Sequence, residues 1–307
     1  MKHFDAAATR AALPFAGLIA ALETRFVAGC TVPPRHVHLI GDTGTTLIMP
    51  AWQERYLGIK TVNIFPGNGA LGLPGLFSTY ILYDATSGAP LAQIDGNEIT
   101  SRRTAAASAL AARYLARPDA ERLLVVGAGR VASLLAEAYH TVLPLRQVAV
   151  WNRRHDSALA LAASLCEQGL HAHAVTDLEA AVRHADIVSC ATLSTAPLIR
   201  GAWLKAGSHL DLIGGFTPRM IEADDACFSD AGIYVDTEEA LLKAGDLLGP
   251  MSRGVFAAPD IRATLSQLCR GERGGRRHAD DRTVFKSVGT ALEDLAAAML
   301  VINHISP

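Results

Sequence analysis

The sequence predicts an α/β fold of two domains: one is built around a parallel β-sheet, and the other is a split α+β domain formed by both ends of the chain. Three observations support this prediction. The chain has 307 residues, half of them hydrophobic, which exceeds the usual size of one domain. Residues 116–283 alternate apolar strand-like runs with helical patterns, which indicates a parallel sheet covered on both faces. Residues 1–115 and 284–307 lack this alternation, and we expect them to form the second domain together.

Composition and charge favour a small-molecule partner. The 28 basic and 30 acidic residues nearly cancel, so nothing points to nucleic acid or to an anionic membrane surface. The five cysteines are scattered without a C-x-x-C pair, a spacing that is typical of reduced thiols in the cytoplasm and predicts no metal site. No segment reaches the roughly 18 uninterrupted apolar residues of a membrane span.

The first element expected is an amphipathic helix over residues 11–22. This apolar run has the length of a secretory signal, but charged residues follow it in place of a small-residue cleavage site. Leu18, Leu22 and Phe26 recur at helical spacing, which favours a helix that buries one face.

Short β-type runs and one long helix complete the first part of the chain. Pro-Gly and Gly-rich breaks separate the runs, which predicts a mixed or antiparallel sheet. The Ala-rich segment 99–114 predicts a long helix with Thr100 and Ser101 as candidate caps. The four runs are 36–40, 45–49, 61–65 and 79–83.

From Arg122 onward the pattern becomes strand, helix, strand, as a parallel sheet requires. The charged, Gly-rich segment 269–282 predicts a solvated loop in preference to a basic binding patch. Segment 284–305 is apolar at helical spacing, and we expect one helix there that returns to the first domain.

A glycine-rich turn follows the first strand of the parallel sheet. In LLVVGAGRVA, residues 123–132, Gly127 permits a tight turn, and Gly129 lets a pyrophosphate approach the backbone at the helix N-terminus. The strand, the helix and the second strand fall where a dinucleotide-binding unit requires them, which indicates a Rossmann NAD(P)-binding domain rather than a merely structural turn. The residues expected to contact the cofactor here are Gly127, Ala128, Gly129, Arg130 and Val131.

The end of the second strand bears on the choice of cofactor. An NAD-specific site usually places an acid there, but this chain has Asn152, Arg153 and Arg154. Asn152 can bond the ribose while an arginine meets a 2′-phosphate, so we expect NADPH, with NADH as the alternative. The alternative for the arginines is simple solvation.

Later strand ends supply further candidates. Thr192, Ser194 and Gly214 follow apolar strands at the carboxyl edge of the sheet, where open α/β folds bind ligands. We expect them to line the nicotinamide pocket, although a turn without ligand contact is nearly as good an explanation for Ser194. To the nearby acids Glu222 and Asp246 we assign surface or capping roles.

Three cations of the first domain stand beside apolar neighbours. An unpaired charge is costly in such a setting, so Arg35, Lys60 and Arg103 are candidates for a substrate carboxylate clamp. Taken singly, each is also typical of a salt bridge or of an exposed side chain.

Ordered motifs from Val32 to the C-terminus resemble the ornithine cyclodeaminase/mu-crystallin family. They are VPPR (32–35), IMPAW (48–52), GIKTVNIFPGN (58–68), ITSRRTAA (99–106), GAGRVA, DIVSCAT, GGFTP and FKSVG (285–289). The resemblance implies a homodimer, with a substrate and dimerisation domain completed by the C-terminal helix. It also implies that Arg35, Lys60 and Arg103 hold the substrate carboxylate, and that Ser287 and Val288 lie beside cofactor and substrate respectively.

One departure from the family pattern affects the expected activity. Ornithine cyclodeaminases carry a catalytic aspartate directly after a Gly-Gly pair, whereas this chain has Phe216. Its segment GGFTPRMIEADD resembles instead the reductases of Δ1-pyrroline-2-carboxylate and Δ1-piperideine-2-carboxylate. We therefore expect NAD(P)H-dependent reduction of a cyclic imino acid to L-proline or L-pipecolate, with Phe216 as an apolar wall and Lys60 as the catalytic residue. The proton donor stays open between Lys60, water and a substrate already protonated in solution.

Three alternatives remain. Ornithine cyclodeamination predicts tightly held NAD and ammonia release from ornithine. An alanine-dehydrogenase-like enzyme requires an open-chain keto acid and ammonium. A binding protein without turnover, as mu-crystallin-like members suggest, predicts that loss of Lys60 changes ligand affinity alone.

Overall fold

The computed structural model describes residues 1–304, and the chain divides into two compact units. Unit 1 comprises Met1–Arg103 and Thr290–Pro307, and unit 2 comprises Thr104–Gly289. The first boundary thus falls inside the long predicted helix rather than after residue 115. The second boundary follows Gly289, so residues 284–289 belong to unit 2 and not to the split domain.

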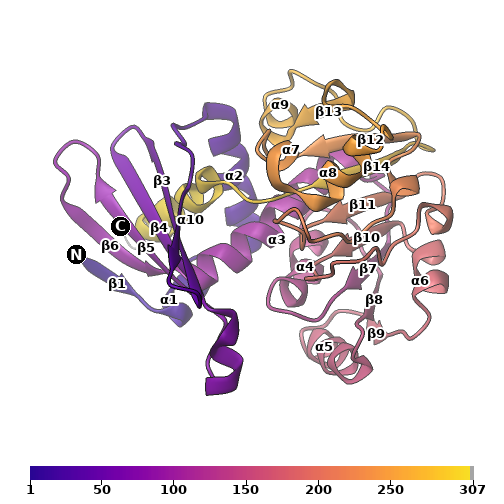
Figure 1. Ribbon diagram of the computed structural model, residues 1–307, viewed down its shortest axis with the longest axis horizontal. Helices are drawn as coiled ribbons and strands as arrows, with labels where there is room; N and C mark the ends of the chain where they lie inside the picture. Colours follow the sequence, from indigo (N-terminus) through magenta and orange to yellow (C-terminus); the bar gives the residue numbers. More distant parts are fainter. Residues whose placement is uncertain (305–307) are drawn as a thin grey trace. The chain divides into compact units, whose positions relative to one another are not determined.

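Unit 1 contains a six-stranded mixed sheet in the order β1-β6-β5-β4-β3-β2, with only β1 and β6 parallel. This confirms the predicted mixed or antiparallel sheet. The elements are β1 (Lys2–Phe4), α1 (Ala6–Ala11), α2 (Phe15–Ala28), β2 (His36–Ile40), β3 (Gly44–Gln53), β4 (Tyr56–Ile64), η1 (Pro66–Leu71), β5 (Leu76–Asp84), β6 (Pro90–Asp95), the start of α3 (Gly96–Leu115), and α10 (Ala291–Asn303). Helix α10 packs on β3 and β4 and against α2 (Figure 1).

The helices of unit 1 differ in their bounds from the predicted ones. Helix α2 starts at Phe15 instead of residue 11, because Pro14 has the fixed φ that suits a helix start. Its residues Leu18, Leu22 and Phe26 are buried as predicted. Helix α3 starts at Gly96, and the Asp95 carboxylate accepts the hydrogen bond of the Glu98 N–H at 2.8 Å. Thr100 and Ser101 therefore lie inside the helix, and the prediction that they cap it was wrong.

Unit 2 contains an eight-stranded sheet in the order β13-β12-β14-β11-β10-β7-β8-β9, and all its strand pairs are parallel (Figure 1). This confirms the predicted α/β class. After the rest of α3 come β7 (Arg122–Val126), α4 (Ala132–His140), β8 (Gln147–Trp151), α5 (His155–Glu167), β9 (Ala172–Ala174), α6 (Leu178–His184), β10 (Ile187–Cys190), η2 (Gly201–Trp203), β11 (His209–Leu212), η3 (Asp225–Cys227), β12 (Ala231–Val235), α7 (Ala240–Lys243), α8 (Gly245–Ser252), η4 (Ala258–Asp260), β13 (Ile261–Thr264), α9 (Leu265–Cys269) and β14 (Arg282–Lys286).

The segment 284–305 does not form the single helix that its apolar spacing predicted. Its first residues belong to β14, a central strand between β11 and β12, and only Ala291–Asn303 is helical. A short apolar run fits a buried strand and a helix equally well, which explains the error. Gly289 separates the two elements with a φ of 75°, a conformation that favours glycine. Ile305 lies outside the described residues.

The segment 269–282 is largely exposed, as predicted, but one of its arginines is anchored. Arg276 donates from Nε to the Leu115 carbonyl oxygen at 2.8 Å and from Nη2 to the Ser208 carbonyl oxygen at 3.1 Å. Within the described residues, no helix is long and apolar enough to cross a membrane.

Candidate functional site

Lys60 lies in the middle of the buried face of the sheet in unit 1. On β4 it stands between Met49 of β3 and Tyr80 of β5, and this row faces α10. The Lys60 side chain is only 2% exposed. A lysine at such a place needs a partner, because burying an unpaired charge is costly.

The partner of Lys60 is an acid of α10. Lys60 Nζ lies 2.6 Å from Asp294 Oδ2 and donates to Thr100 Oγ1 at 3.4 Å. Arg103 of α3 reaches the same helix: its Nε lies 3.0 Å from Asp294 Oδ1, and its Nη1 lies 2.5 Å from Glu293 Oε2. The structure therefore brings two of the three predicted cations together through Asp294.

Charges in this cluster are balanced, since two cations face two buried acids. Burial lowers the pKa of Lys60 to about 8, against the attraction of Asp294. Burial disfavours the charged form of Asp294, but the neighbouring Lys60 and Arg103 outweigh it and hold the pKa of that carboxyl below its usual range. At neutral pH the cluster is thus ionised, and Lys60 loses its proton first as the pH rises.

Arg35 lies next to this cluster along the sheet. It directly precedes β2, whose His36 pairs with Ile48; continuing this register by one residue sets Arg35 opposite Met49, whose other neighbour is Lys60. Arg35 and Lys60 are therefore two strands apart, about 10 Å between backbones, and lie in one row. Long side chains can converge across that span, as the predicted clamp requires.

Sequence reasoning missed the two acids of this cluster. Glu293 and Asp294 stand side by side in an otherwise apolar helix, and both are fully buried. Adjacent acids in a helix predicted to be buried require cationic partners, and this signal was available in the sequence. The acids share charge with the clamp, so a ligand that binds there must compete with them or carry a positive charge itself.

The glycine-rich turn of unit 2 has the shape of a phosphate cradle. Gly127 has a φ of 120°, and a Cβ there would lie 2.7 Å from the Ala191 carbonyl oxygen, so only glycine fits. A Cβ at Gly129 would meet no atom within 4 Å, which leaves the backbone open to a ligand. Helix α4 starts at Ala132, directly after the turn, so the turn stands at a helix N-terminus. These residues fit a dinucleotide pyrophosphate.

The end of β8 carries the residues predicted to choose the cofactor. Trp151 ends the strand, and its carbonyl oxygen accepts from Gly127 N–H at 2.8 Å, which ties this end to the turn. Asn152 Nδ2 donates to the Arg154 carbonyl oxygen at 3.0 Å. Arg153 and Arg154 are exposed, as is Arg130 at the turn. The exposed guanidinium groups are accessible to a phosphate.

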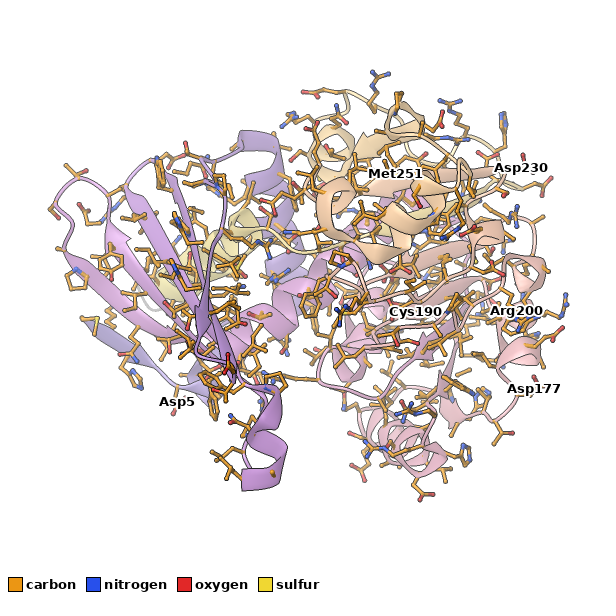
Figure 2. The ribbon with its side chains drawn as sticks, viewed as in Figure 1. Asp5, Asp177, Cys190, Arg200, Asp230 and Met251 are labelled. Carbon is orange, nitrogen blue, oxygen red and sulfur yellow. The ribbon has the colours of Figure 1, made fainter. Side chains whose placement is uncertain are left out.

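Thr192 and Gly214 follow the adjacent strands β10 and β11, as predicted. Cys190 ends β10 in the interior of the sheet (Figure 2). Thr192 lies between two glycines: a Cβ at Gly127 would be 3.4 Å from its Cγ2, and a Cβ at Gly214 would be 1.8 Å from its carbonyl oxygen. Ser194 is bound locally, since its Oγ donates to the Ala196 carbonyl oxygen at 2.6 Å.

Glu222 and Asp246 do not have the surface or capping roles that we assigned to them. Both are fully buried. Glu222 accepts hydrogen bonds from Thr192 and from Gly214, while Asp246 binds Lys286 Nζ at 2.9 Å. Both acids therefore lie in the protein interior at the carboxyl edge of the sheet, beside the predicted cofactor residues Thr192 and Gly214.

The remaining predicted residues lie on loops of unit 2. Phe216 follows the Gly-Gly pair after β11 and is 38% exposed. Ser287 is buried, and its N–H donates to the Leu212 carbonyl oxygen at 3.2 Å. Val288 N–H donates to Asp236 Oδ2 at 2.8 Å. The structure fixes the backbone at Ser287 and Val288; their contacts to ligands stay predictions.

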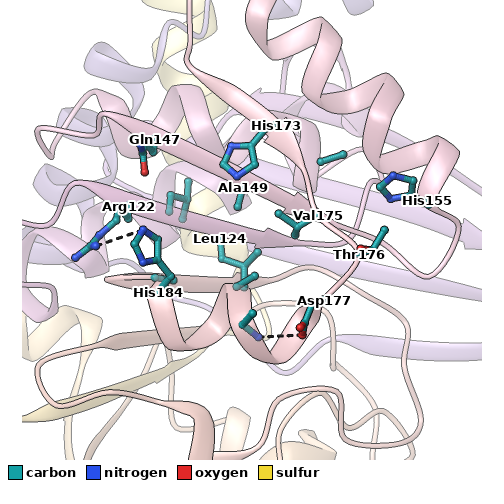
Figure 3. A pocket seen from close by; sticks show the side chains of 15 residues that line it. Arg122, Leu124, Gln147, Ala149, His155, His173, Val175, Thr176, Asp177 and His184 are labelled. Carbon is teal, nitrogen blue, oxygen red and sulfur yellow. Dashed lines mark hydrogen bonds between the residues drawn. The ribbon is translucent and has the colours of Figure 1, made fainter.

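A separate cavity of about 440 Å³ lies along β7, β8 and β9 beside α6, and no predicted site residue lines it (Figure 3). Two of its polar groups pair locally: Arg122 Nη1 lies 3.4 Å from His184 Nε2, and Asp177 caps α6 by accepting from Ala180 N–H at 3.0 Å. His155, which also lines the cavity, has a buried Nδ1 without a hydrogen-bond partner.

Comparison with known proteins agrees with this geometry. A family model described as the ornithine cyclodeaminase/mu-crystallin family matches residues 11–307. A Δ1-pyrroline-2-carboxylate reductase of Paracoccus denitrificans is 42% identical over 281 residues, which cover 89% of this chain and 88% of that protein.

Two solved structures are similar along almost the whole chain. The Thermococcus litoralis Δ1-pyrroline-2-carboxylate reductase in complex with NADH and L-proline has a TM-score of 0.94 at 29% identity, covering 99% of this chain and 97% of that one. An archaeal alanine dehydrogenase dimer with bound NAD has a TM-score of 0.93 at 29% identity, covering 99% and 95%. The predicted fold and resemblance are confirmed, and the chain belongs to the ornithine cyclodeaminase/mu-crystallin family.

Proposed function

We propose that this protein reduces a small cyclic imino acid, Δ1-pyrroline-2-carboxylate or Δ1-piperideine-2-carboxylate, with NAD(P)H, to give L-proline or L-pipecolate. One observation carries the choice of reduction over cyclodeamination: the loop after β11 offers no carboxylate for work on a substrate amine. Phe216 follows the Gly-Gly pair, and every acid further along the loop already has a partner.

The partners of these acids are specific. Glu222 holds Thr192 and Gly214. Asp224 accepts from the Gly201 N–H at 2.9 Å, and Asp225 forms a 2.6 Å ion pair with Arg253. A base for amine deprotonation would have to break one of these arrangements, whereas imine reduction needs no such base. The Paracoccus and Thermococcus relatives, both described as Δ1-pyrroline-2-carboxylate reductases, support the same choice.

The residues of unit 1 suit a substrate that carries both charges. Arg35, Lys60 and Arg103 hold the carboxylate by charge-assisted hydrogen bonds. Asp294 and Glu293 keep the net charge near zero and favour the protonated iminium over the neutral imine. When bound, a reduced nicotinamide would supply a hydride to the C=N carbon, and the π electron pair of that bond would go to nitrogen. Because the iminium already carries its proton, the product amine forms without a further donor.

We propose NADPH as the preferred cofactor, with NADH as a weaker alternative. Arg153 is exposed at the end of β8, and no acid precedes it to bond a ribose hydroxyl in the manner of NAD-specific sites. A guanidinium at this place matches a 2′-phosphate by bidentate bonding.

We also propose that the active form is a homodimer in the cytoplasm. The sheet face opposite Lys60 presents apolar side chains that are exposed or half buried, including Trp52 and Phe77 at 40% and 44% exposure and Ile59 and Ile81. Such a face is typical of an interface between copies. Ile59→Glu should yield a monomer in light scattering, whereas the same change at the exposed Leu242 should leave the mass unchanged.

The proposed activity is tested by NADPH oxidation with Δ1-pyrroline-2-carboxylate and Δ1-piperideine-2-carboxylate in separate assays. Parallel assays contain L-ornithine with NAD, and an open-chain keto acid with ammonium. Rapid oxidation with a cyclic imino acid and no ammonia from ornithine is expected. Ammonia release from ornithine, or turnover that requires added ammonium, would replace the proposal by one of the two alternatives.

A further inference from the structure

A single buried carboxylate connects the ends of two neighbouring strands in unit 2. Glu222 Oε1 accepts from both the Thr192 N–H and the Thr192 Oγ1–H at 2.7 Å, and Oε2 accepts from the Gly214 N–H at 2.8 Å. Thr192 follows β10, and Gly214 follows β11. All three donors point at one carboxylate, so its position fixes both strand ends.

The two glycines beside Thr192 show how tightly this edge is packed. A Cβ at Gly214 would lie 1.8 Å from the Thr192 carbonyl oxygen and 2.5 Å from Glu222 Oε1. On the other side, Thr192 Cγ2 would be 3.4 Å from a Cβ at Gly127, the first glycine of the phosphate turn. Thr192 therefore lies beside the turn that we expect to hold the dinucleotide.

A second acid and a lysine hold Glu222 in place. Asp246 Oδ1 accepts from the Glu222 N–H at 2.6 Å, and Asp246 Oδ2 accepts from Lys286 Nζ at 2.9 Å. Lys286 is the last residue of β14, directly before Ser287. The chain of contacts thus continues from β10 and β11 to the end of β14.

We propose that Glu222 is a positioning residue for the reduced dinucleotide: as a carboxylate it sets Thr192 and Gly214 in the conformation that binds the cofactor, and on protonation it releases them. This inference rests on the proposed function, because it concerns the cofactor of that reaction. Glu222 acts through Thr192 and Gly214, and it is not a catalytic residue.

The surroundings of Glu222 bring its protonation into the physiological range. Burial, together with the nearby Asp246, raises the pKa of Glu222 to about 7, against the attraction of Lys286. The charged or titratable groups that face it are Asp246 on α8, Lys286 on β14 and Cys190 on β10. A protonated Glu222 keeps fewer acceptor sites for the three donors, so the strand ends loosen as the pH falls through about 7.

The same titration has the opposite effect on stability. Because the pKa of Glu222 is raised in the folded protein, folding takes up a proton in the range between the ordinary value and about 7. Protonation at acid pH therefore stabilises the fold. If a residue had only a structural role, its titration would change cofactor affinity and protein stability in the same direction. For Glu222 we expect acidification to lower cofactor affinity and to raise stability.

The test measures NADH binding to the full-length protein by the change in nicotinamide fluorescence, without any imino acid. NADH is the probe because it lacks the 2′-phosphate, which titrates in the same range. In wild type the dissociation constant should rise about tenfold from about pH 8.5 to about pH 6. In Glu222→Gln the dissociation constant should be about tenfold larger than in wild type at the higher pH and nearly independent of pH.

Controls separate positioning from general damage. Asp225→Asn makes the same carboxylate-to-amide change three residues away in an exposed ion pair, and it should bind NADH as wild type does. Thermal unfolding at both pH values should show that wild type gains stability on acidification relative to Glu222→Gln. If Glu222→Gln does not fold, Thr192→Val, which removes the hydroxyl that donates to Glu222 and accepts from the Ser194 N–H, should weaken NADH binding severalfold and keep the pH dependence.

The outcomes distinguish this inference from the proposed function. A wild-type protein that binds neither NADH nor NADPH would overturn both. A wild type that binds NADH with an affinity independent of pH, or a folded Glu222→Gln that binds it as tightly as wild type, would overturn the role of Glu222 and leave the reductase proposal intact.

Discussion

Each unit buries a cluster of charges, and the two clusters differ in their balance. In unit 1, Lys60 and Arg103 face Asp294 and Glu293, so cations and acids are equal in number. In unit 2, Glu222 and Asp246 share the single cation Lys286. In the balanced cluster the acids stay ionised and Lys60 is the group whose charged form is weakened, whereas in the acid-rich cluster it is the charged form of Glu222.

This difference assigns a separate pH limit to each ligand. Lys60, with a pKa lowered to about 8 by burial, loses its charge on the alkaline side. Glu222, with a pKa raised to about 7 by burial, loses its charge on the acid side. We therefore expect alkaline pH to weaken binding of the imino acid carboxylate and acid pH to weaken binding of the dinucleotide.

The largest effect should come from unbalancing the cluster in unit 1. Asp294→Asn leaves Lys60 and Arg103 with one buried acid, which should lower the free energy of unfolding by about 3 to 5 kcal/mol. Denaturant titration measures it. The same change at the exposed Asp225 should stay within about 0.5 kcal/mol. A loss below about 1 kcal/mol for Asp294→Asn would show that water already compensates this charge.

Removal of a cation proposed to hold the substrate should have the next largest effect. Lys60→Met keeps most of the apolar stem of the side chain and deletes its charge, so kcat/KM for the imino acid should fall about 100-fold. The affinity for NADPH should stay unchanged, since the residues proposed to bind the cofactor lie in unit 2. Lys243→Met, on the short helix α7, serves as the matched control. If Lys60→Met weakened NADPH binding as much as it lowered kcat/KM for the imino acid, the two ligands would not have separate sites.

A smaller effect is expected at the end of β8. Arg153→Ser should weaken NADPH binding about tenfold through loss of the 2′-phosphate contact and leave NADH binding nearly unchanged. Fluorescence titration with both dinucleotides gives the ratio. Equal weakening of both would assign Arg153 to another part of the cofactor, and no change would make it a solvated residue.

The smallest effect should appear in the wild-type pH profile. At saturating NADPH, kcat/KM for the imino acid should decline severalfold as the pH rises through about 8, since neutral Lys60 binds a carboxylate less strongly while Arg103 stays charged. Initial rates in buffers of constant ionic strength measure this limb. A profile that stays flat beyond the pKa of Lys60 would show that Arg35 and Arg103 suffice for the carboxylate.

The sequence predicted local features well and long-range ones poorly. The phosphate turn is contained in residues 123–132, and its strand and helix follow directly from that pattern. The role of Glu222 depends on Thr192, 30 residues earlier, and the bonds of Arg103 to Asp294 and Glu293 join residues about 190 positions apart. Such partners depend on the order of the strands in the sheet, which cannot be read from a single sequence.

The segment after Arg282 shows a second limit. Its apolar residues continue at helical spacing from a strand into α10, so the period alone did not separate the two elements. The structure separates them, because β14 is paired on both sides, by β11 and β12, and its residues from Thr283 to Lys286 are buried. The motif FKSVG was recognised in the sequence, but only the structure shows that it begins within β14 and continues beyond the end of that strand.

Transfer of hydride from NADPH to the imino acid can be followed with an isotopic label. Wild-type protein is incubated with NADPH deuterated at nicotinamide C4 and with Δ1-pyrroline-2-carboxylate, and the amino acid formed is analysed by mass spectrometry. We expect L-proline that carries deuterium at Cα from one of the two C4 diastereomers. Unlabelled proline, or no proline together with ammonia release from ornithine, would contradict it.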